Sequence, residues 1–141
     1  MQQILEFSAN HPLLVGGFLA ILTLLIVGEV RRVTRGFPVV SAVRATELLN
    51  HDDAVFLDIR EQSEFSDGHI LNTLHIPAGA IDDRIKELEK YRDRPIIVYC
   101  ATGTGSLSVC ASLLKQGFEK VANLGGGLQA WKTANLPVTS K

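Results

Sequence analysis

The 141-residue sequence has only two cysteines, Cys100 and Cys110, and therefore offers no disulfide framework. Isolated thiols of this kind are typical of proteins in a reducing compartment. The 14 basic and 15 acidic side chains leave a net charge of −1, and no long run carries a single sign. Because binding to nucleic acid depends strongly on positive charge, we expect no nucleic-acid partner.

The patterns of two common ligand sites are also missing. His69 and His75 have no other ligand-type residues at a spacing typical of a metal site, so hydrogen-bonding roles are favoured for both. The three consecutive glycines at 125–127 do not form the G-x-G-x-x-G pattern of a dinucleotide-binding loop. The sequence therefore predicts neither a metal nor a cofactor.

Charge is absent from residues 12–28, which are almost entirely apolar. A membrane-spanning helix needs about 17–25 such residues, and residues 4–10 extend this run into the interface. The run lacks the polar stripe of a core helix. It also lacks the basic start and the small-residue cleavage site of a signal peptide. We therefore predict a retained, single-pass transmembrane helix.

Basic residues lie on only one side of this predicted helix. Residues 1–12 contain no Lys or Arg, whereas Arg31, Arg32 and Arg35 follow the apolar run. The positive-inside rule then places everything from Arg31 onward in the cytoplasm. The predicted organisation is an N-terminal segment at 1–30 with the transmembrane helix, a linker at 31–37, and a globular domain at 38–141.

The globular part alternates short apolar runs with segments of helical periodicity. Strands are expected at residues 38–41, 54–57, 74–76, 96–99 and 121–124, and helices at 44–50, 61–67, 80–90, 106–116 and 128–134. This alternation predicts an α/β domain of three layers, with helices on both faces of a mainly parallel five-stranded sheet. Ligands bind such sheets at the carboxyl ends of the strands.

Cys100 stands at such a strand end. The apolar run 96–99 leads into it, a loop of small residues follows, and a helix is expected from Ser106. Backbone N–H groups in such a loop, together with a helix N-terminus, attract anions and lower the pKa of a cysteine. A cysteine after a buried strand is more often a small core residue, but this loop favours Cys100 as a nucleophile. Cys110 alternates with apolar residues of the helix and is expected in the core.

Three blocks of this region resemble the rhodanese-like domains. The first reads D-x-R-x-x-x-E-F-x-x-G-H-I from Asp58, followed by T-x-H-I-P from Thr73. The second is Tyr99-Cys100 with its small-residue loop and helix. The third is G-F-x-x-V-x-x-L-x-G-G-x-x-A-W from Gly117, with L-P-V at 136–138. The blocks occur in order and at the family's spacings. With one apolar helix in front, the chain resembles the membrane-anchored, single-domain rhodaneses of the bacterial inner membrane.

This resemblance implies sulfur transfer. A thiolate at Cys100 would take the outer sulfur of a sulfane sulfur donor such as thiosulfate, carry it as a persulfide, and pass it to a thiol acceptor or to cyanide. The implied partners are thus a sulfur donor and a thiol acceptor, each a small molecule or a protein. The expected substrate contacts are Ala101, Thr102, Gly103, Thr104, Gly105, Ser106 and Arg60. For Arg60, a structural ion-pair network with Asp58 and Glu64 is the favoured alternative.

The loop departs from the family at one position. Active members usually carry an arginine as the sixth loop residue, counting the cysteine as the first, and here that residue is Gly105. Without this cation, thiosulfate is expected to bind more weakly. Two functions follow as alternatives: a sulfurtransferase or sulfur carrier, or a non-catalytic interaction or sensing module at the membrane. A cysteine phosphatase is excluded, because its phosphate-clamping arginine would stand where the sequence has Ser106.

Overall fold

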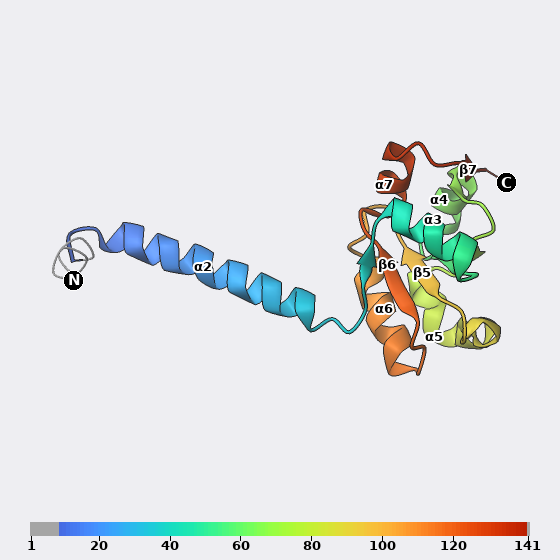
Figure 1. Cartoon of the computed structure of the whole chain (residues 1–141), viewed down its shortest axis with the longest axis horizontal. Helices are drawn as coiled ribbons and strands as arrows, with labels where there is room; N and C mark the ends of the chain where they lie inside the picture. Colours follow the sequence, from blue (N-terminus) through green and yellow to red (C-terminus); the bar gives the residue numbers. More distant parts are fainter. Residues whose placement is uncertain (1–8, 141) are drawn as a thin grey trace. The chain divides into compact units, whose positions relative to one another are not determined.

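The computed structural model describes residues 9–140 and divides the chain into two units between Arg35 and Gly36 (Figure 1). The described part of the first unit consists mainly of helix α2 (Pro12–Val33), which begins with proline in its first turn and continues beyond the expected end at residue 28. Within the described residues, one stretch is long and apolar enough to cross a membrane, Pro12–Arg31. Residues 4–8, part of the expected extension of this run, lie outside the described residues.

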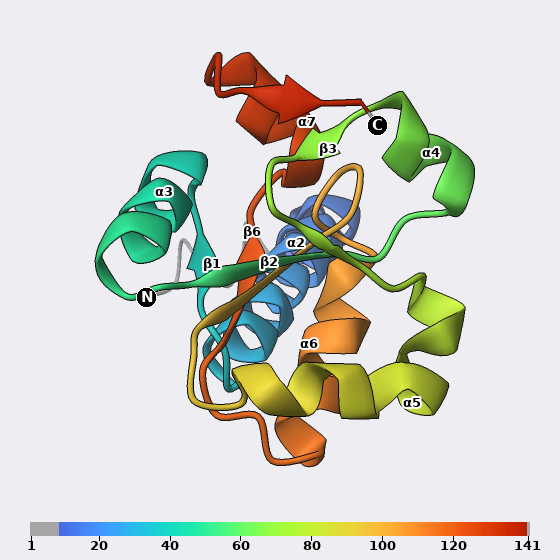
Figure 2. The ribbon, with the colours of Figure 1, turned by 90° about the vertical axis from the view of Figure 1, so that its right-hand side faces the viewer.

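A five-stranded sheet forms the centre of the second unit (Figure 2). Its strand order is β1-β6-β5-β2-β4, and every neighbouring pair is parallel. The strands are β1 (Val39–Val40), β2 (Val55–Asp58), β4 (Leu74–His75), β5 (Ile96–Tyr99) and β6 (Val121–Leu124). The expected parallel sheet is therefore confirmed, with β6, β5 and β2 between the edge strands β1 and β4.

Successive side chains of each strand point to opposite faces of the sheet, so the buried residues form one cluster on each face. Phe56 lies in a cluster with side chains of α3 (Ala42–His51) and α7 (Gly127–Thr133), and its ring contacts Trp131 edge-on at 5.3 Å between centroids. Its neighbour Leu57 lies in a second cluster with α6 (Ser106–Lys115), α5 (Ile81–Arg84) and the 3-10 helix η2 (Ile85–Tyr91). The domain thus has the three layers that the sequence predicts.

The expected continuous helix at residues 80–90 is wrong in detail. The structure replaces it with two 3-10 helices, η1 (Ala78–Ala80) and η2, on either side of the single turn of α5. Ile81 and Leu88 are buried as expected. Apolar spacing marks which side of a helix faces inward, and it does not separate the i+3 hydrogen bonds of a 3-10 helix from the i+4 bonds of an α-helix.

A second, two-stranded sheet was not expected from the sequence. Strands β3 (His69–Ile70) and β7 (Val138–Thr139) pair antiparallel, with Ile70 opposite Val138. Helix α4 (Gln62–Asp67) precedes β3, close to the expected helix at 61–67. Because β3 and β7 are far apart in the sequence and each is very short, their pairing leaves no periodic signal.

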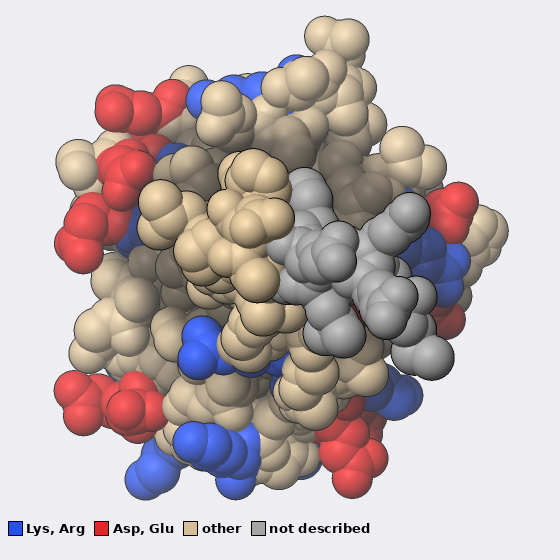
Figure 3. All heavy atoms as spheres, turned by 90° about the vertical axis from the view of Figure 1, so that its left-hand side faces the viewer, with Lys and Arg blue, Asp and Glu red and all other residues tan. Residues whose placement is uncertain are grey.

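Basic and acidic side chains are interspersed on the face of the molecule seen in Figure 3. Exposed ion pairs within the described part of the chain are Arg44–Glu47, Arg84–Glu87, Arg92–Glu89 and Arg94–Asp53. Exposed pairs of this kind contribute little to stability, about 0–1 kcal/mol each. They neutralise the surface arginines of the second unit, Arg44, Arg84, Arg92 and Arg94, whereas its described lysines, Lys132 among them, form no ion pair within residues 9–140.

Candidate active site

Cys100 lies at the carboxyl end of β5, next to the middle of the sheet. The following residues 101–105, here called the active loop, lead directly into α6 at Ser106. The side chain of Cys100 is half-buried, and its thiol is free. The sulfur therefore sits where a parallel sheet presents its ligands, beside the N-terminus of a helix of ten residues.

Hydrogen-bond donors surround the sulfur. The N–H of Gly103 donates to Cys100 Sγ at 3.1 Å, and the hydroxyl of Ser106 lies 3.6 Å from it. Burial raises the pKa of the Cys100 thiol, but hydrogen bonds from the Ser106 hydroxyl and from the N–H groups of Ser106, Thr102 and Gly103 outweigh it. The net effect lowers the pKa of Cys100 below its ordinary value and favours the thiolate.

The first turn of α7, with the glycines at its start, holds the active loop in place. The N–H of Leu128 donates to the carbonyl of Cys100 at 2.9 Å, and the N–H of Gln129 donates to the carbonyl of Ala101 at 3.1 Å. Gly103 has a φ of +84°, and a Cβ there would lie 2.7 Å from the nitrogen of Gly126. A Cβ on Gly127 would overlap the carbonyl oxygen of Cys100. Backbone meets backbone at this contact, so only glycine fits at 103 and 127.

Asn123 holds the active loop from the interior of the protein. This role was not predicted from the sequence. The residue lies in β6 and is almost completely buried. Its Oδ1 accepts a hydrogen bond from the Ser106 hydroxyl, and its Nδ2 donates to the carbonyl of Gly103 at 3.0 Å. The available signal was a single amide within the otherwise apolar strand 121–124, since a buried amide needs polar partners.

The predicted substrate contacts fall into two groups. Ala101, Thr102, Thr104 and Gly105 are exposed around the sulfur, and the hydroxyls of Thr102 and Thr104 lie 3.2 Å apart. Gly103 and Ser106 are buried and meet the sulfur from the protein side. The first group is open to solvent beside the sulfur, whereas the second group contacts the sulfur.

Arg60 lies in a buried ion pair. Its Nη2 is 2.6 Å from Asp58 Oδ2 and also donates to the carbonyl of Gly68 at 2.8 Å, while its Nε contacts both carboxylate oxygens. This geometry matches the Asp58 part of the ion-pair network considered from the sequence, whereas Glu64 forms no ion pair with Arg60. Arg60 nevertheless forms part of the wall of a cleft that Ala101 and Thr102 also line.

Cys110, His69 and His75 are packed and hydrogen-bonded in ways that indicate structural roles. Cys110 is fully buried, with its sulfur 3.7 Å from the carbonyl of Ala122, and burial raises the pKa of its thiol to about 12. His69 and His75 stack on the two sides of Phe65 and hydrogen-bond to backbone carbonyls. Among residues 9–140, no group of three or more His, Cys, Asp or Glu side chains is arranged to hold a metal ion.

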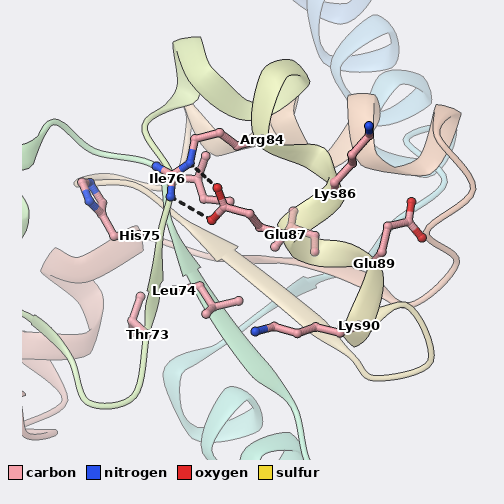
Figure 4. A pocket seen from close by; sticks show the side chains of 10 residues that line it. Thr73, Leu74, His75, Ile76, Arg84, Lys86, Glu87, Glu89 and Lys90 are labelled. Atoms are coloured by element: carbon pink, nitrogen blue, oxygen red, sulfur yellow. Dashed lines mark hydrogen bonds and ion pairs between the residues drawn. The ribbon is translucent and has the colours of Figure 1, made fainter.

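A cleft of about 550 Å³ opens at the edge of the sheet, between β4 and the α5–η2 segment (Figure 4). Arg84 and Glu87 point toward one another there and form an ion pair at 2.6 Å. Neither Cys100 nor any residue of the active loop lines this cleft. The size of this cleft therefore does not bear on the donor-rich region around Cys100.

The arrangement provides a nucleophile that needs no attached general base. The sulfur's hydrogen-bond donors are an alcohol and backbone N–H groups, which do not titrate near neutral pH. They are oriented by the fold before any substrate arrives, and they stabilise negative charge on sulfur. Such a site suits covalent chemistry in which charge moves from one sulfur atom to another.

Removing the Ser106 hydroxyl should raise the pKa of Cys100. In Ser106→Ala, the midpoint of Cys100 alkylation by iodoacetamide should shift to higher pH, toward the value of an unperturbed cysteine, about 8.5. The reaction is followed by intact mass across a pH series. Ser108→Ala, which removes an exposed hydroxyl from the same helix, should leave the midpoint unchanged. An unchanged midpoint in Ser106→Ala would show that the hydroxyl does not stabilise the thiolate.

Comparison with known proteins places this geometry in a family. Residues 41–134 match the rhodanese-like domain. The uncharacterized protein YibN of Escherichia coli K12 is 33% identical over 139 residues, covering 98% of this chain and 97% of that protein. The thiosulfate sulfurtransferase GlpE of Coxiella burnetii is 36% identical over 93 residues, covering 66% of this chain and 85% of that protein.

Solved structures agree with this assignment. A thiosulfate sulfurtransferase from Pseudomonas aeruginosa superimposes with a TM-score of 0.68 at 30% identity, covering 80% of this chain and 22% of that one. The rhodanese-like domain of the Anabaena protein Alr3790 gives a TM-score of 0.65 at 31% identity, covering 74% of this chain and 80% of that one. The chain therefore belongs to the rhodanese-like family, and sulfurtransferases are among its relatives.

Proposed function

We propose that this protein is a membrane-tethered sulfurtransferase or sulfur carrier that forms a persulfide on Cys100. The observation that carries the proposal is the set of donors around Sγ, with the Gly103 N–H at 3.1 Å and a lowered pKa. Its relatives include sulfurtransferases at 36–37% identity, which supports the same reaction class. No cofactor takes part in the proposed reaction.

Loading begins with the Cys100 thiolate. It attacks the outer sulfur of thiosulfate, a new S–S bond forms, and the old S–S bond breaks as sulfite leaves with the bonding electron pair. The product is a persulfide whose negative charge lies on its terminal sulfur. The N–H groups that held the thiolate, and the N-terminus of α6, then stabilise this new anion.

Unloading follows the same chemistry with a different nucleophile. A thiolate or cyanide attacks the terminal sulfur of the persulfide, and the Cys100 thiolate leaves with the bonding electrons. The lowered pKa of Cys100 favours this step, because a weaker base is a better leaving group. The exposed residues Ala101, Thr102, Thr104 and Gly105 are the proposed contacts for donor and acceptor, with Arg60 on the adjoining wall.

A non-catalytic interaction or sensing module is the second candidate. The neutral active loop favours it, because Gly105 and its neighbours supply no side-chain cation for a small anionic substrate. In that case Cys100 would react as an ordinary thiol and would not hold sulfur. The two functions differ in one observable, the persulfide itself.

Cys100 is expected to gain one sulfur atom. The full-length protein in detergent micelles, incubated with thiosulfate or with cysteine persulfide, should increase in intact mass by one sulfur and lose it when cyanide is added. Cys100→Ser should gain no sulfur, whereas Cys110→Ser should load normally because Cys110 is buried. Absence of loading from every donor would leave the interaction module as the function.

An arginine at position 105 should improve loading from thiosulfate. Gly105 has ordinary helical dihedral angles, and a Cβ there would lie 3.7 Å from Cys100 Sγ, so the site accepts a side chain next to the sulfur. A charge-assisted hydrogen bond contributes about 1.5–3 kcal/mol, which predicts loading roughly ten times faster or more in Gly105→Arg. Gly105→Gln supplies similar length without charge and should not show this gain. Equal rates for both variants would mean that the missing cation does not limit the reaction.

We also propose that α2 anchors the protein in the bacterial inner membrane with the domain in the cytoplasm. Pro12–Arg31 meets the requirement of length and apolarity, and YibN aligns with this chain across the helix as well as the domain. The arginines that follow the apolar run support a cytoplasmic domain.

A reporter fused after Lys141 tests this topology. A green fluorescent protein fusion should be fluorescent and membrane-bound, and an alkaline phosphatase fusion should be inactive, because phosphatase folds correctly only outside the cytoplasm. The intact mass of the extracted protein should include residues 1–30. Phosphatase activity would overturn the orientation, and a mass lacking the N-terminal residues would identify a cleaved signal sequence.

A further inference from the structure

A small cleft of about 320 Å³ adjoins the active loop and is distinct from the larger cleft at β4. Ala101 and Thr102 line one side, and Gln129 and Lys132 of α7 line another. The hydrogen bond from the Gln129 N–H to the Ala101 carbonyl fixes the first turn of α7 against the loop. Lys132 follows Gln129 by three residues and therefore shares its side of the helix. We call this space the α7 cleft.

Lys132 gives the α7 cleft its charge. Arg60 also lines the cleft, but Asp58 balances its guanidinium at 2.6 Å. Lys132 is exposed, and its side-chain ammonium forms no ion pair or hydrogen bond within residues 9–140. No Asp or Glu is among the residues lining the cleft. The ammonium of Lys132 thus has no carboxylate partner in the α7 cleft, and this cleft begins at Ala101, one residue after Cys100.

The location of this charge bears on which donor or acceptor is used. The active loop carries no cation, so it offers a small inorganic anion only backbone N–H groups and hydroxyls. A larger molecule that bonds to Cys100 through its own sulfur must place the rest of its body beside the loop. A carboxylate on that body would meet Lys132, with the amide of Gln129 and the hydroxyl of Thr102 nearby.

We infer that the α7 cleft binds the carboxylate-bearing body of a small organic persulfide, and that Lys132 is the residue that selects it. This inference rests on the proposed function. The Cys100 thiolate attacks the outer sulfur of the protonated persulfide R–S–SH, and R–S⁻ leaves with the electrons of the broken S–S bond. The new Cys100 persulfide then releases its proton to water. Lys132 contacts the carrier body and takes no part in the bond changes.

Charge reversal at Lys132 tests this selection in the full-length protein in detergent micelles. Loading from glutathione persulfide, whose carrier body has carboxylates, is compared with loading from 2-hydroxyethyl persulfide, whose carrier body is uncharged. Lys132→Glu should slow the first reaction roughly tenfold or more and leave the second nearly unchanged, and the difference should shrink at high salt. The matched control is Lys115→Glu, an exposed lysine of α6 that does not line the cleft, and it should change neither rate. Equal slowing of both donors by Lys132→Glu, or no slowing of either, would overturn the inference.

A binding measurement separates this inference from the proposed function. S-methylglutathione cannot transfer sulfur, and its binding to Cys100→Ser is followed by ligand-observed NMR, with and without Lys132→Glu. Binding that is lost on charge reversal supports the cleft even if no donor loads Cys100. Absent binding, or binding unaffected by Lys132→Glu, overturns the cleft assignment even if Cys100 loads normally.

Discussion

Two backbone hydrogen bonds, from Leu128 and Gln129 to the carbonyls of Cys100 and Ala101, join the active loop to the start of α7. The rest of the site depends on this contact. It holds the loop in a curve that turns the Gly103 N–H toward the sulfur, and it is possible only because Gly103 and the turn before α7 carry no side chains at the contact. The sheet brings the two segments together, since β5 and β6 are parallel neighbours and the active loop and the glycines at 125–127 follow them at the same edge.

The charge on sulfur is stabilised here by dipoles and not by a cation. N–H groups and a hydroxyl oriented by the fold need no reorganisation when charge develops, which is the advantage of a preformed anion site. Ser106 and Asn123 fix these donors from the buried side, because the amide of Asn123 hydrogen-bonds to both the hydroxyl of Ser106 and the carbonyl of Gly103. Among the described residues that line the cleft beside the active loop, Arg60 is paired with Asp58 and Lys132 of α7 has no carboxylate partner.

Much of the fold was visible in the sequence because β2, β5 and β6 are short, apolar and followed by helical periodicity. Cys100 and its loop were identified for the same reason: a strand, a thiol and small residues stand next to one another in the chain. Asn123 and Lys132 were not identified as site residues. Asn123 of β6 lies 20 residues after its partner Gly103 in the chain, and Lys132 of α7 lies still further along. Nothing in their immediate neighbours in the sequence indicates that they approach the loop.

The sequence by itself determined the alternation of strands and helices, the apolar α2, the position of Cys100 at a strand end and the absence of a loop arginine. These are local properties, set by side-chain polarity and by the residue types that a tight loop accepts. Only the tertiary structure decided the strand order, the pairing of β3 with β7 and the division of the loop into exposed and buried residues. It also decided the assignment of Arg60 to Asp58, because which partner neutralises a charge depends on burial and three-dimensional distance.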